Sequence, residues 1–167
     1  MKFRKAAILL LVLFTSVACD QVTKIGARKY LEGEGTTSYL GDTFRLTYIE
    51  NHGAFLGLGS SLPEFWRTMI FVVFVTAMLI GVVVWTIRTP KVSTLALVSL
   101  SLVVGGGVGN LIDRVLFDGG VTDFLNIGIG SLRTGIFNVA DVWIMLGAGL
   151  LFLARDFREP KEASETS

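Results

Sequence analysis

The sequence predicts a mainly α-helical, polytopic membrane protein with four transmembrane helices, a small extracytoplasmic β-sheet and a short interfacial helix. Hydrophobic residues make up 51% of the 167 residues and charged residues only 17%, and the mean hydropathy is +0.63. Soluble domains carry about 25% charged residues. Four apolar runs approach or reach the roughly 20 residues needed to cross a bilayer.

The four apolar runs define the expected spans. The first follows a basic start and ends in SVAC at Cys19, so a cleaved signal peptide or lipobox is an alternative. Because other spans follow, we expect it to be retained as a helix. Together the spans form one membrane-embedded domain over 1–157, followed by a disordered cytoplasmic tail at 158–167. The spans are expected at about 6–25, 68–87, 92–112 and 136–154.

Two longer connections, about 26–67 and 113–135, separate these spans. In the first, TFRLTYI alternates apolar and polar residues, which indicates a strand, and nearby glycines suggest a small sheet on the membrane surface. Pro63 is typical of a helix start. The amphipathic piece that leads to Trp66 fits the membrane interface, where tryptophan is favoured.

The basic residues of the short flanks favour one orientation. They lie before the first span, between the second and third, and after the fourth, so an even number of spans places them all on one side. The positive-inside rule makes that side cytoplasmic. Both termini are then cytoplasmic, and the two longer connections face outward. The flanking residues are Lys2, Arg4, Lys5, Arg88, Lys91, Arg155, Arg158 and Lys161.

This topology brings several polar residues to the outer membrane boundary. Asp20 lies near the end of the first span, and Asn110 and Arg114 share a helix face at the end of the third. Asn138 and Asp141 share a face at the start of the fourth, which places Asp141 roughly 8 Å below the boundary. Ionisable groups near the bilayer are costly, so they indicate function.

Structural interpretations compete with functional ones for some residues. Asp20 precedes Lys24 by four residues, the favoured order for a helical ion pair. The glycine spacing of Gly105–Gly109 allows close helix packing. Asp113 is expected either in a buried pair with a neighbouring arginine or in solvent, and Asp118 beside two glycines is typical of a turn.

Asp123 and Asp141 have no basic partner nearby in the sequence. Two adjacent carboxylates cannot both ionise cheaply, so one keeps a proton and the other acts as a base. Such a pair can activate water to attack an amide and protonate the leaving amine. The same carboxylates could serve a proton- or ion-coupled transporter, and a non-catalytic membrane assembly factor is a third hypothesis.

Composition argues against other classes. A formal net charge of +1 provides no attraction for nucleic acid. A single cysteine excludes an intrachain disulfide and a cysteine-cluster metal site, and a single histidine leaves little for zinc. We therefore expect no metal.

Five blocks of the sequence resemble, in order, the motifs of the lipoprotein signal peptidases, also called signal peptidase II, which are bacterial membrane aspartic peptidases. The similarity extends to about Phe157, and the ordered set is far more specific than any single block. The blocks are DQVTK at 20–24, NHGAF at 51–55, GNLIDR at 109–114, VTDF at 121–124 and FNVAD at 137–141.

The resemblance implies a catalytic dyad of Asp123 and Asp141. It implies a prolipoprotein substrate whose cysteine already carries diacylglycerol, cut just before that cysteine at the outer leaflet of the bacterial cytoplasmic (inner) membrane. No cofactor would be needed, globomycin would inhibit, and the enzyme would act as a monomer among membrane lipids. The substrate-binding or site-supporting residues would be Asp20, Lys24, Asn51, Gly53, Asn110, Arg114, Asn138 and Ala140.

Overall fold

The computed structural model describes residues 2–53, 59–89 and 92–154. The expected disordered tail at 158–167 lies outside these residues. In chain order the elements are α1 (Lys2–Leu31), β1 (Thr37–Tyr39), β2 (Phe44–Asn51), α2 (Glu64–Thr68), the π-helix η2 (Met69–Phe74), α3 (Val75–Arg88), α4 (Thr94–Leu116), β3 (Val121–Ile129), β4 (Leu132–Arg133) and α5 (Val139–Leu153).

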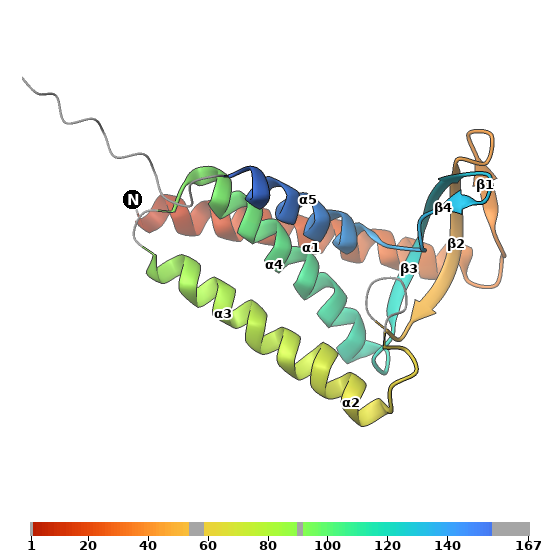
Figure 1. The fold of residues 1–167 in the computed structure, drawn as a ribbon, viewed down its shortest axis with the longest axis horizontal. Coiled ribbons are helices and arrows are strands. Elements are labelled where there is room, and N and C mark those ends of the chain that lie inside the picture. The colour runs from red at the N-terminus through yellow and green to blue at the C-terminus, as the bar shows by residue number, and fades with distance from the viewer. Residues whose placement is uncertain (1, 54–58, 90–91, 155–167) are drawn as a thin grey trace, which may run out of the picture.

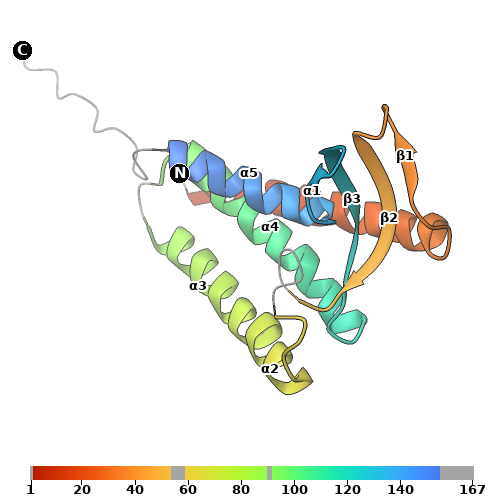
Figure 2. The ribbon, with the colours of Figure 1, turned by 45° about the vertical axis from the view of Figure 1, so that its right-hand side comes forward.

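The helices form a bundle that carries the sheet at one end (Figures 1 and 2). Within the described residues, three helical runs are long and apolar enough to cross a membrane, and α5 is a shorter apolar helix. The mainly helical membrane fold with a small sheet is therefore confirmed. The N-terminus and the end of α3 lie at the bundle end away from the sheet, where Lys5 Nζ donates to the Thr89 carbonyl at 3.3 Å.

Helix α4 packs tightly against α1 and α5 because glycines lie at the contacts. A Cβ on Gly105 would collide with Ser16 of α1, and one on Gly109 would lie 2.5 Å from Asp20 Oδ2. A Cβ on Gly106 would collide with the backbone of α5. The predicted close packing at Gly105 and Gly109 is thus confirmed, and short polar side chains can bridge the helices.

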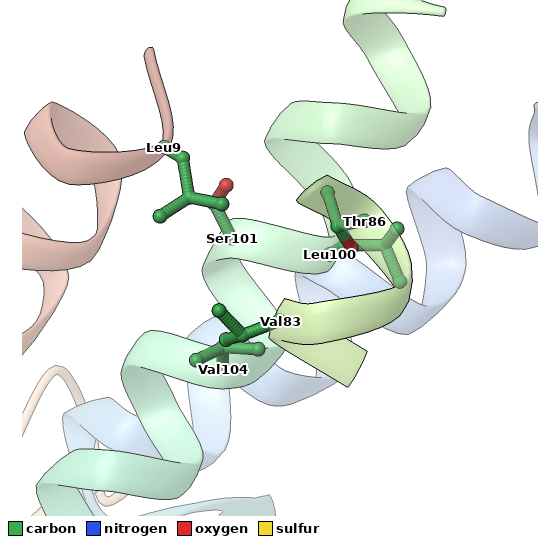
Figure 3. Close-up of a pocket in the computed structure, with 6 residues that line it drawn as sticks. All are labelled: Leu9, Val83, Thr86, Leu100, Ser101 and Val104. Carbon is green, nitrogen blue, oxygen red and sulfur yellow. The ribbon is translucent and has the colours of Figure 1, made fainter. Parts of the chain in front are cut away.

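Helix α3 is joined more loosely to the bundle and buries only Leu79 and Thr86. The hydroxyl of Thr86 donates to the Val82 carbonyl, and that of Ser101 donates to the Leu97 carbonyl, so each is satisfied within its own helix. Figure 3 shows the narrow crevice between α1, α3 and α4, which is lined by Leu9, Val83, Thr86, Leu100, Ser101 and Val104.

The sheet is antiparallel, with strand order β1-β2-β3-β4. Strand β2 coincides with the predicted TFRLTYI strand and continues to Asn51. Strand β3 was expected only as part of the outer loop 113–135. Its first four residues, Val121–Phe124, are all buried, so apolar and polar residues do not alternate there as they do in β2.

Three helix boundaries differ from the expected spans. Helix α1 runs past residue 25 to Leu31, and α4 runs to Leu116, which brings Asp113 into a helix. The expected interfacial helix and the second span form one continuous run, Glu64–Arg88, in which the π-helix joins α2 to α3. Site residues near these boundaries are therefore held by regular backbone hydrogen bonds.

We predict that Gly106→Ala lowers the stability of the fold, because the new Cβ presses on the backbone of α5. Overpacking of this kind costs about 1–3 kcal/mol. Gly149→Ala on α5 is the matched control, since nothing lies within 4 Å of a Cβ there. Thermal unfolding in detergent should give a lower midpoint for Gly106→Ala than for Gly149→Ala. Equal midpoints would contradict the close contact.

Candidate active site

Two carboxylates meet where the sheet joins the helices. Asp123 lies on β3 and is only 2% exposed. Its Oδ2 accepts a hydrogen bond from Asn51 Nδ2 at 2.9 Å, and its Oδ1 accepts one from Asn138 Nδ2 at 2.6 Å. These two amides come from β2 and from the start of α5, so Asp123 is held from both sides.

Asp141 lies in the first turn of α5 and forms a capping box with Asn138. The Asp141 N–H donates to Asn138 Oδ1 at 3.0 Å, and the Asn138 N–H donates to Asp141 Oδ2 at 3.1 Å. Asn110 Nδ2 donates to the remaining oxygen, Asp141 Oδ1, at 3.0 Å. The helix N-terminus favours negative charge on Asp141, and Asn138 contacts both carboxylates.

Burial raises the pKa of Asp123 to about 6. The hydrogen bonds from Asn51 and Asn138 act in the opposite direction by stabilising the ionised form, and the nearby Asp141 raises the pKa further. Removal from water is the larger effect. Asp123 therefore gains a proton far more readily than an exposed aspartate.

A buried lysine holds the amide that faces Asp141. Lys24 Nζ donates to Asn110 Oδ1 at 2.8 Å and forms ion pairs with Asp20 Oδ2 at 2.9 Å and Asp113 Oδ2 at 3.4 Å. All three charged side chains are fully buried. Because Asn110 Oδ1 faces Lys24, its NH₂ group faces Asp141. The predicted helical pair of Asp20 and Lys24 is confirmed.

Asp20 also fixes the start of α5. Its Oδ1 accepts the Ala140 N–H at 2.8 Å, which satisfies one of the unpaired donors of the first helical turn. Ala140 is fully buried, and a Cβ on Gly109 would touch its side chain, so the contact leaves little room for larger residues. The helix that carries Asp141 is thus anchored to α1.

Arg114 and Gly53 lie on the other side of Asn51. The Asn51 Oδ1 accepts the Gly53 N–H at 2.9 Å, and Arg114 Nη2 donates to the Gly53 carbonyl at 2.8 Å. The guanidinium lies 5.3 Å from the ring of Phe71 in η2. Arg114 Nε is buried without a hydrogen-bond partner in the described part of the chain.

The structure joins all ten residues expected at the site into one hydrogen-bonded network. Four further members were not assigned to the site from the sequence: Gln21, Arg28, Asp113 and Thr122. Asp113 forms the buried pair that was one of its two expected settings, but with Lys24 and Arg28 instead of Arg114. The spacing of Asp20, Lys24 and Arg28 along one helix face is the signal that could have revealed Arg28.

Two neighbouring carboxyls that are both bonded to Asn138 can share a proton, which is the arrangement that general acid–base hydrolysis requires. Within the ranges that the structure describes, no three His, Cys, Asp or Glu side chains are grouped as a metal site. The expected independence from a cofactor stays a prediction.

The raised pKa of Asp123 predicts a pH-dependent stability. Between its ordinary value of 3.8 and about 6, the folded protein binds more protons at this carboxyl than the unfolded chain does. Its free energy of unfolding should therefore fall as the pH rises from about 4 to about 6, and level off above. Over this pH range, the difference in the free energy of unfolding between the original protein and Asp123→Asn should change by at most about 3 kcal/mol. Unfolding in detergent at several pH values measures it, and a constant difference would contradict the shift.

Comparison with known proteins identifies the family of this chain. The family model described as Signal peptidase (SPase) II matches residues 12–157. A lipoprotein signal peptidase from Hydrogenovibrio crunogenus is 35% identical over 145 residues, which cover 87% of this chain and 83% of the relative. One from Brevibacillus brevis is 38% identical over 137 residues, covering 82% and 87%.

A solved structure agrees as well. It is described as a bacterial membrane enzyme determined by the in meso method at 2.3 Å resolution, and it matches with a TM-score of 0.76 at 28% identity. The match covers 92% of this chain and 94% of that chain. The chain therefore belongs to the signal peptidase II family, the membrane aspartic peptidases that remove signal peptides from lipoproteins.

Proposed function

We propose that Asp123 and Asp141 are the catalytic dyad of this peptidase. The observation that carries the proposal is the position of Asn138, whose side-chain NH₂ donates to the Asp123 carboxylate and whose backbone N–H donates to the Asp141 carboxylate. Asp141, whose charge is favoured at the helix N-terminus, acts as the base, and Asp123 holds the shared proton as the acid.

The reaction proceeds with a water molecule between the two carboxyls. Asp141 takes a proton from the water as its oxygen attacks the scissile carbonyl, and a tetrahedral intermediate forms. Asp123 gives its proton to the leaving amine as the C–N bond breaks. The proton on Asp141 then returns to Asp123, which restores the starting state.

The substrate is a prolipoprotein whose cysteine already carries diacylglycerol, and the bond cut lies just before that cysteine. The site lies where apolar helices meet the sheet, so the lipid chains can stay in the bilayer while the peptide reaches the carboxyls. The enzyme works as a monomer without a cofactor, and a cyclic peptide such as globomycin inhibits it by occupying the same site.

The other site residues divide into two groups by their contacts. Gly53 and Arg114 face the substrate, and Asn51 joins them to Asp123. The second group holds the dyad in place through the contacts described above. Its members are Asp20, Lys24, Asn110, Asn138 and Ala140.

Asp123→Asn and Asp141→Asn should each lower the cleavage rate by roughly 10³-fold or more, because the two carboxyls act as a unit. The loss in the double variant should not exceed that of either single one. The measurement is cleavage of a lipid-modified prolipoprotein by purified, folded protein, beside its unmodified form, which should not be cut.

Asp118→Asn is the matched control. Asp118 has φ +47° in a turn, a conformation that asparagine tolerates, and turnover should stay close to that of the original protein. Near-normal turnover by Asp123→Asn or Asp141→Asn would end the dyad proposal, whereas cutting of the unmodified form would end the substrate proposal.

The orientation that we propose places both termini in the cytoplasm and the sheet outside. It is supported by the basic residues at the bundle end away from the sheet, such as Lys5 and Arg88. In a Cys19→Ser background, an impermeant thiol reagent should label Thr36→Cys in spheroplasts. It should label Thr89→Cys only after lysis. The reverse pattern would refute the orientation.

A further inference from the structure

We propose that Arg28, which lies outside the five motif blocks, is a positioning residue for Asp123 and acts through Thr122. The inference rests on the proposed dyad. Arg28 Nη1 donates to Thr122 Oγ1 at 2.6 Å. The contact joins α1 to β3 across 94 residues of sequence, directly beside Asp123.

Thr122 is held by its backbone as well as by its side chain. Its N–H donates to Asp113 Oδ2 at 3.0 Å, and the same oxygen lies 3.6 Å from Arg28 Nη1. Thr122 is 3% exposed, and Asp113 is fully buried. Arg28, Asp113 and Thr122 therefore form a closed three-residue clamp between α1, α4 and β3.

The arginine itself is oriented by an aromatic ring. Its guanidinium carbon lies 4.3 Å from the centroid of Phe117, at the end of α4. The side chain is 19% exposed, so its charge is only partly screened by water. A planar guanidinium can stack on the ring and still direct one N–H to Thr122, whereas a lysine ammonium lacks this fixed geometry.

The clamp bears on the chemistry because successive side chains of a strand point to opposite faces. Thr122 points to Arg28 on α1, and Asp123 points to the amides of Asn51 and Asn138. Fixing Thr122 thus fixes the rotation of β3 that presents Asp123. Small errors in the position of a reacting group cost up to about 10²-fold in rate.

The test compares Thr122→Val and Thr122→Ser in cleavage of a lipid-modified prolipoprotein. Valine keeps the volume and the N–H bond to Asp113 but removes the hydroxyl that Arg28 contacts. We expect Thr122→Val and Arg28→Gln each to lower kcat roughly tenfold with little change in KM, because the dyad is displaced and substrate binding is not. Thr122→Ser should keep most of the turnover.

Two further variants complete the test: the double variant and a control variant at a neighbouring residue. Because both changes break one bond, Arg28→Gln with Thr122→Val should be no slower than the worse single variant. Lys29→Gln is the matched control, since Lys29 is an exposed cation on the same helix and should leave kcat unchanged. Thermal unfolding in detergent checks that each variant is folded. If Arg28→Gln does not fold, the comparison of Thr122→Val with Thr122→Ser tests the inference by itself.

Three results would overturn the inference: full kcat in Thr122→Val, additive losses in the double variant, or a raised KM with kcat unchanged. Asp123→Asn is measured alongside as a reference. If it is inactive while Thr122→Val is fully active, the inference alone fails. If it cleaves the substrate, the dyad proposal fails and the inference fails with it.

Discussion

One buried ammonium group, that of Lys24, organises the site. It pairs with two buried carboxylates that bond to different elements: Asp20 bonds to the start of α5, and Asp113 bonds to the start of β3. Removing one partner from a buried ion pair costs about 3–5 kcal/mol, because the remaining charge is left without compensation. Lys24, with Arg28 on the same helix, thus connects the two segments that carry Asp123 and Asp141.

The two aspartates are chemically identical but lie in different settings. Asp141 belongs to a helix terminus, where backbone dipoles favour its charge, and Asp123 lies on a strand removed from water. Asn138 connects the settings, because its side chain caps the helix and also donates to Asp123. The fold therefore places the two aspartates of the proposed dyad on different kinds of secondary structure.

Local patterns in the sequence predicted what depends on neighbouring residues. The apolar runs, the alternating strand at β2 and the pair of Asp20 and Lys24 all follow from periodicity, and the structure contains them. Strand β3 was missed because its first four residues are buried on both faces, so apolar and polar residues do not alternate there. The partnership of Arg28 with Thr122 joins residues 94 apart, and no local pattern encodes such a contact. The motif blocks supplied the remaining site residues by resemblance.

The double use of Asn138 limits how this site can change under selection. An antibiotic that occupies the space between the carboxyls would normally select substitutions among the residues around it. Here a change at Asn138 would remove the side-chain cap of α5 and one hydrogen-bond donor to Asp123 together. A substitution at this position would therefore weaken the start of α5 and the support of Asp123 at once, which makes it a costly route to resistance.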